Sequence, residues 1–181
     1  MSEDGRWSLL HRAVTDTGIP IDVRAAASLL LVYGLPITFI AELTIDDITT
    51  HGGKVCLRVG EHRTQLPPAV ASLIEQTIAA ARAPSVIGRA VPGTRWLFPG
   101  RLPGWPIAAA SLGQRLRRHG IMVRHSRTAR LSLAEDLPAP VLSKLLGISV
   151  TAATRWTHNA RRDWLSFVSA RAATTSSSPT L

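Results

Sequence analysis

The 181-residue sequence has one cysteine, one tyrosine, two lysines and no long apolar run. A single cysteine excludes an internal disulfide, and the position of Cys56 in a strand-like run predicts a small core residue. No apolar run approaches the roughly 20 residues that a membrane helix needs, so a membrane partner is not expected. The acidic, polar start MSEDGRW is unlike a secretory signal. These absences predict a soluble protein of the cytoplasm.

The sequence also lacks the short motifs of the common enzyme classes. It contains no G-x-S-x-G, no P-loop, no G-x-G-x-x-G and no Cys/His cluster with the spacing of metal ligands. The adjacent pair Asp46 and Asp47 is expected to be a solvated turn, because no third carboxylate lies nearby to complete a metal site. We therefore expect neither a cofactor nor a metal.

Acidic residues are scarce in the C-terminal part of the chain. Residues 1–100 contain nine Lys+Arg and nine Asp+Glu, whereas residues 101–181 contain twelve basic and three acidic residues, which accounts for the whole net charge of +9. Nineteen of the 21 basic residues are arginines, whose planar guanidinium suits bidentate contacts with phosphate. This concentration of charge favours a polyanionic partner for the C-terminal part.

Hydrophobic periodicity predicts an α+β fold that is mostly α-helical, with one small antiparallel β-sheet. Alternating Val55, Leu57 and Val59 indicate a strand, which pairs with residues 62–66 across a turn at Gly60. Asp22 is expected to cap the most apolar helix, which ends at Gly34 and Pro36. Helices are expected at 7–16, 23–34, 37–44, 69–83, 108–120, 127–135, 138–146, 150–160 and 162–170.

The stretch 84–107 is rich in proline and glycine and is expected to be a surface loop pinned by Trp96, Phe98 and Trp105. The Ser- and Thr-rich C-terminus is expected to be disordered. The predicted organisation is an N-terminal extension with a short helix (1–21), one DNA-binding domain (22–170) and a disordered tail (171–181).

The stretch VLSKLLGISVTAATRW, read alone, resembles a helix-turn-helix with its turn at Gly147. Together with three other segments it resembles the catalytic domain of the tyrosine recombinases (phage integrases), over roughly residues 22–168. The four matching segments follow in the order of that family: LLLVYGLPITFIAELTIDDI for the first box, KVCLRVGEHRTQLP for the hairpin, WLFPG for the L-F-P loop, and HSRTARLSLAEDLPAPVLSKLLGIS for the second box.

The resemblance implies a reaction in which a tyrosine attacks a phosphodiester while arginines and a histidine or lysine stabilise the phosphoryl charge. This sequence has Pro36 at the first arginine position, Ile148 at the histidine of L-L-G-H-S, and Trp156 near the tyrosine. Its only tyrosine, Tyr33, lies in an apolar run and is expected in the core.

The residues that remain of the family's site are Arg127 and, one residue out of step, His125; only Arg58 or Arg63 aligns with the hairpin lysine. The resemblance therefore implies a protein without strand-transfer activity. We expect it to bind double-stranded DNA near the nucleoid. The candidate contacts are Arg115, Arg117, Arg118, Arg124, Arg127, Arg130, Arg155, Arg161 and Arg162.

Two alternatives remain at this stage. The chain could be a divergent but active site-specific recombinase, with a tyrosine supplied by another subunit. It could instead be a protein-interaction module whose Trp/Pro loop 96–107 docks on an active recombinase. Self-association also remains open. Covalent trapping on DNA separates the first alternative from simple binding, and loss of DNA binding in arginine variants separates the second.

Overall fold

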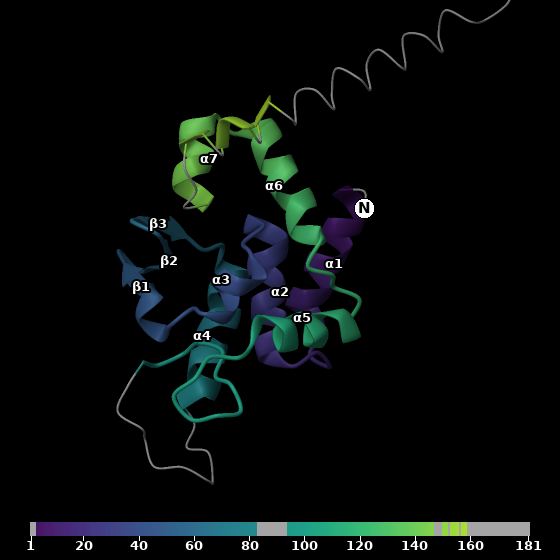
Figure 1. Cartoon of the computed structure of the whole chain (residues 1–181). Coiled ribbons are helices and arrows are strands. Elements are labelled where there is room, and N and C mark those ends of the chain that lie inside the picture. The colour runs from purple at the N-terminus through teal and green to yellow at the C-terminus, as the bar shows by residue number, and fades with distance from the viewer. Residues whose placement is uncertain (1–2, 83–93, 147–149, 152, 156, 159–181) are drawn as a thin grey trace, which may run out of the picture.

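The computed structural model describes residues 3–82, 94–146, 150–151, 153–155 and 157–158 (Figure 1). The fold class predicted from the sequence is confirmed: the chain is mostly helical, with one three-stranded antiparallel sheet. The elements in chain order are α1 (Glu3–Thr15), α2 (Ile21–Tyr33), α3 (Ile37–Ala41), the 3-10 helix η1 (Ile45–Asp47), β1 (Ile48–His51), β2 (Lys54–Val59), β3 (His62–Gln65), α4 (Pro68–Arg82), α5 (Ala109–Arg118), α6 (His125–Asp136) and α7 (Ala139–Leu146).

Helix α2 lies at the centre of the molecule and contacts α1, α4, α5 and α6 (Figure 1). Its sequence IDVRAAASLLLVY is apolar on almost every side, which is typical of a helix buried all round. The N-cap residue of α2 is Pro20, whereas Asp22 lies inside the first turn, so the predicted cap at Asp22 is wrong. Helix α1 begins before the predicted start at residue 7, and its Leu10 and Ala13 belong to the same core as α2.

The predicted hairpin is confirmed, and β1 extends it into the order β1-β2-β3. Gly52 and Gly53, at φ 56° and 73°, form the tight turn between β1 and β2, where both central residues need positive φ. Leu57 and Val59 are buried, and Val55 shares their face. Cys56 points to the opposite face and is only half-buried, so its predicted core position is wrong.

The segment from Thr94 to Ala108 is partly pinned as predicted. Phe98 is buried, and the Trp96 indole donates a hydrogen bond to the Gly104 carbonyl oxygen at 2.9 Å. Trp105 is 67% exposed, so its predicted anchoring role is wrong. The loop is held by its backbone at that point, since the Gly100 N–H donates to the Trp105 carbonyl oxygen at 2.9 Å.

Helix α6 joins two apolar clusters. Its first half packs on α2, while Ala134 near its end packs with Leu142 of α7 and with Ala153. Residues 150–151, 153–155 and 157–158 are helical. The turn of the predicted helix-turn-helix, residues 147–149, lies outside the described residues, as do the expected helix 162–170 and the tail 171–181.

Candidate nucleic-acid interface

The start of α6 gathers the basic residues that the sequence singled out. Arg124 precedes the first turn, and Arg127 lies within it; both side chains are exposed. Neither guanidinium forms an ion pair with a carboxylate among the residues that the structure describes. Two positive groups therefore face solvent within one turn of helix.

His125 lies between these arginines but points inward, with 7% of its surface exposed. Its Nδ1 accepts a hydrogen bond from the Met122 N–H at 3.2 Å, which places the proton of the neutral ring on Nε2. Burial, followed by the charge of Arg124, lowers the pKa of His125 below its ordinary value of 6.5. The imidazole is thus neutral near pH 7 and adds no positive charge to the surface.

Gly34 fixes how the α2–α3 connection meets α6. The glycine has φ 64°, and a Cβ atom placed on it would lie 2.6 Å from Arg130 Cγ and 2.7 Å from the Ser126 carbonyl oxygen. The backbone of the connection therefore lies directly against the first turns of α6. Pro36 follows two residues later as the exposed residue before α3, and it brings no charge to this position.

Arg130 lies about one turn after Arg127, and its side chain packs against Gly34, where the α2–α3 connection meets α6. Its Nη2 donates to Ser126 Oγ at 3.2 Å, and the side chain is half-buried. Burial and then the charge of Arg127 lower the pKa of Arg130, although a guanidinium stays protonated in proteins. Like charges three residues apart on a helix repel each other, so an anion bound here would relieve the repulsion.

The remaining candidate residues divide into three groups. Arg117 and Arg118 in the last turn of α5, and Arg155, are exposed. Arg115 forms a two-pronged ion pair with Asp22, in which Arg115 Nη2 lies 2.9 Å from Asp22 Oδ1. The other candidate positions lie outside the described residues: Ile148, Trp156, Arg161 and Arg162.

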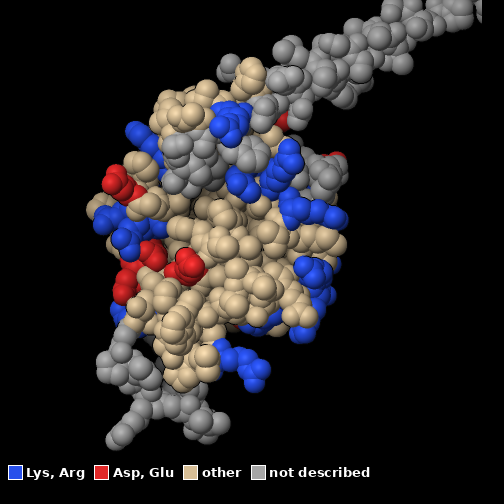
Figure 2. Space-filling view, in the orientation of Figure 1, with Lys and Arg blue, Asp and Glu red and all other residues tan. Residues whose placement is uncertain are grey.

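The distribution of charge over the molecule is uneven. Figure 2 shows acidic side chains mainly on the left of the view, beside the sheet, where basic side chains also lie. Basic side chains predominate down the right, on the side where Figure 1 has α1, α5 and α6. This local excess of basic groups supports a positive potential over that side.

A second basic group lies on the outward face of the sheet, and the sequence reasoning did not assemble it. The register pairs Arg58 directly with Arg63, and His51 with Lys54, all four on the same face. Arg58 is partly neutralised by Asp47, whose Oδ1 lies 3.0 Å from Arg58 Nε. The alternation of Val55, Leu57 and Val59 that predicted the buried face of β2 also places Lys54 and Arg58 on the opposite face.

No protein-family model matches the sequence, and no curated protein matches it. Solved structures do match. The XerA recombinase superposes with a TM-score of 0.64 at 16% identity, over 92% of this chain and 63% of that one. The Tn1549 transposon integrase in complex with transposon right end DNA gives 0.58 at 14% identity, over 93% and 65%. The XerH site-specific recombinase bound to its difH substrate gives 0.57 at 17%, over 87% and 49%.

The chain has the fold of a tyrosine recombinase catalytic domain. It spans about half to two-thirds of the length of each recombinase compared above. In the described part of this recombinase fold, no three His, Cys, Asp or Glu side chains are grouped as metal ligands would be. None of the described helices has the length and apolar character to cross a bilayer.

Proposed function

We propose that this recombinase-like chain binds double-stranded DNA and does not transfer strands. The observation that carries the proposal is the exposed pair Arg124 and Arg127 at the start of α6, with Arg130 adding charge behind them. Arg117 and Arg118 at the end of α5 would extend the surface. Solved recombinases and integrases of the same fold are described as DNA complexes, which supports the same class of partner here.

Phosphate is the ligand that this arrangement suits. Guanidinium groups make bidentate contacts with phosphate oxygens, and each contact releases condensed counterions from the duplex. Such contacts position a protein on DNA but carry no sequence information. We therefore expect binding with modest sequence preference and strong salt dependence.

The proposed loss of strand transfer is supported by the state of the groups that the reaction would need. The only tyrosine, Tyr33, is buried, and its hydroxyl donates to the Gln65 carbonyl oxygen at 3.0 Å. Burial, followed by nearby Cys56, raises the pKa of Tyr33 to about 12, which disfavours the phenolate nucleophile. Pro36 supplies no cation, and His125 is neutral. Strand transfer would thus need a tyrosine from outside this sequence.

We leave Arg115 out of the proposed contact set, because its guanidinium is already paired with the Asp22 carboxylate. If five or six of the other arginines contact phosphates, log affinity should fall with log salt at a slope of roughly −4.5 to −5.5, near −0.9 per contact.

Fluorescence anisotropy with a short labelled duplex over a range of salt concentrations tests this. Arg127→Gln should weaken binding and make the slope shallower by about 1. Arg95→Gln, which removes the same charge from a guanidinium paired with Asp46, is the matched control and should leave the slope unchanged. Salt-independent binding, or equal effects of the two variants, would contradict the proposal.

A further inference from the structure

The loop between Pro99 and Pro106 is built to present two apolar side chains to solvent. Pro99 and Pro106 form a bridge across its base, and Ile107 N–H donates to the Phe98 carbonyl oxygen at 2.9 Å. A Cβ atom on Gly100 would lie 2.5 Å from the Pro106 carbonyl oxygen, so only glycine permits the two sides to approach this closely. The loop backbone is therefore held in place, while the side chains at its tip stay exposed.

Leu102 and Trp105, at 68% and 67% exposure, form what we call the knob. Apolar side chains carried on an ordered backbone lose less conformational freedom on binding than those on a flexible loop, and tryptophan is among the residues that most often dominate protein interfaces. Arg101 lies beside the knob, is exposed, and forms no ion pair with any described residue. The loop thus offers an apolar contact with one adjacent positive charge.

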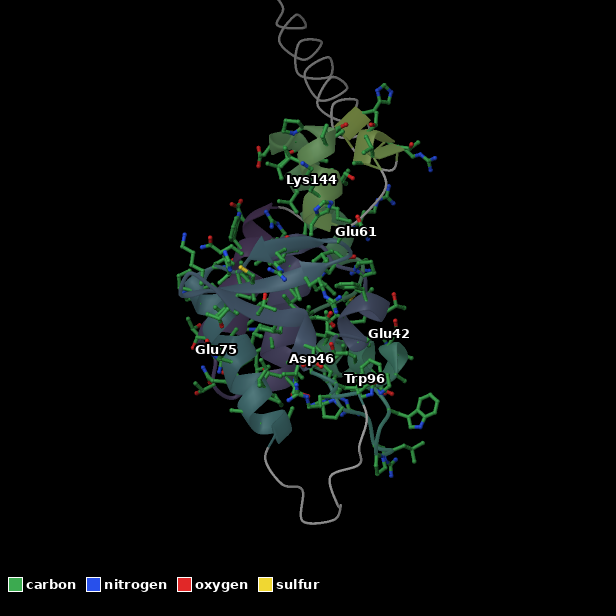
Figure 3. The ribbon with its side chains drawn as sticks, turned by 90° about the vertical axis from the view of Figure 1, so that its left-hand side faces the viewer. Glu42, Asp46, Glu61, Glu75, Trp96 and Lys144 are labelled. Atoms are coloured by element: carbon green, nitrogen blue, oxygen red, sulfur yellow. The ribbon has the colours of Figure 1, made fainter. Side chains whose placement is uncertain are left out.

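A pocket of about 410 Å³ lies between the sheet and α4. Its lining is complementary to the knob, since it combines apolar side chains with acidic ones. Its rim holds Asp46 and Glu75 (labelled in Figure 3) together with Arg95. Asp46 Oδ1 already pairs with Arg95 Nη2 at 2.6 Å, whereas Glu75 is exposed and has no ion-pair partner in the described part of the chain. The apolar lining comes from Ile45, Ile48, Val55, Ile78 and Ala79.

We propose that the knob of one copy of this chain enters the pocket of a second copy, with Arg101 of the first against Glu75 of the second. The two surfaces are complementary, because each combines apolar side chains with one charge that has no ion-pair partner among the described residues, and the two charges are opposite. The pocket volume lies within the range of sites that accept a side chain or ligand of this size. The inference does not depend on DNA binding.

Self-association through this contact should be weak in free solution. A knob and one pocket cover much less than the roughly 1,200 Å² of a standard stable interface. Sedimentation velocity without DNA should therefore show a weight-average mass that rises with protein concentration up to about 1 mM. Chains aligned on one duplex would associate more strongly, because the second contact then becomes intramolecular.

Trp105→Ala should weaken self-association at least about tenfold. The side chain is mostly exposed, so the variant should fold normally, and far-UV circular dichroism checks this. Trp7→Ala is the matched control, because Trp7 is 52% exposed but lies on α1, away from the knob and the pocket. It should associate as the unmodified protein does.

Exchanging the two charges tests whether Arg101 pairs with Glu75. Arg101→Glu and Glu75→Arg should each weaken self-association about tenfold, because each places like charges together. An equimolar mixture of the two variants should recover association, since the knob of the first then fits the pocket of the second. A protein that stays monomeric, an unchanged Trp105→Ala variant, or a mixture without recovery would overturn the proposal. A monomer in which Trp105→Ala lowers DNA affinity would assign the loop to DNA instead.

Discussion

Replacing Gly34 by alanine tests the contact that holds the basic start of α6 in place. Gly34 has a φ of 64°, and a Cβ atom at this position would lie 2.6 Å from Arg130 Cγ and 2.7 Å from the Ser126 carbonyl oxygen. Among the amino acids, only glycine adopts this backbone conformation and fits this space without strain. Arg130 can shift its flexible side chain, but the Ser126 oxygen is backbone of α6. The methyl group must therefore push α6 away from the end of α2.

The expected loss has two parts. An L-residue in the left-handed region costs about 1–2 kcal/mol. Forcing an extra methyl group into an occupied space costs a further ~1–3 kcal/mol. The free energy of unfolding should thus fall by roughly 2–5 kcal/mol, a large share of the ~5–15 kcal/mol typical of a domain.

Gly52→Ala supplies the matched control. Gly52 has φ 56°, but nothing lies within 4 Å of its Cβ position, so this variant carries the backbone strain without the clash. Alanine reduces the freedom of the unfolded chain equally at both positions, and this contribution cancels in the comparison. The difference between the two variants measures the clash alone, at ~1–3 kcal/mol.

Urea denaturation followed by tryptophan fluorescence gives both values, provided that the slopes with urea agree. The Gly34→Ala variant should also bind DNA more weakly, because the backbone that carries Arg127 has moved. Equal destabilisation by Gly34→Ala and Gly52→Ala would refute the tight contact between the α2–α3 connection and α6.

Two further predictions concern the tyrosine chemistry. Because Tyr33 is the only tyrosine, absorbance near 295 nm during alkaline titration should report it alone, with ionisation near pH 12 rather than 10 while the protein stays folded. The neutral form is the one favoured in the folded state, so this contribution to stability is present below pH 10 and is lost as pH rises from about 10 to 12; Tyr33→Phe should abolish that dependence, and a folded protein titrating near pH 10 would contradict it. Trp156→Tyr should give no covalent adduct with a nicked suicide DNA substrate on a denaturing gel, because each missing charge stabiliser is worth ~10²–10³ in rate; a protease-sensitive shifted band would show that the site is intact.

The sequence determined the local elements and their order. The nearly continuous apolar run of α2, the alternation of Val55, Leu57 and Val59, and the glycine turns predict a central helix and a hairpin that the structure confirms. These features depend on neighbours in sequence, which is why pattern and turn chemistry suffice. Four motifs in family order also predicted the recombinase fold, although no family model matches the sequence and the identity to the XerA recombinase is 16%.

The tertiary structure decided which side chains remain available for a partner. Nothing near Arg115 in sequence shows that Asp22, 93 residues away, neutralises it. Nothing near Trp105 shows that its loop is held by backbone bonds that leave the indole outside. Burial and ion pairing depend on which distant segments come into contact, and local sequence patterns do not contain that information. The sequence therefore determined where the arginines lie along the chain, and packing decided which of them face solvent without a counter-charge.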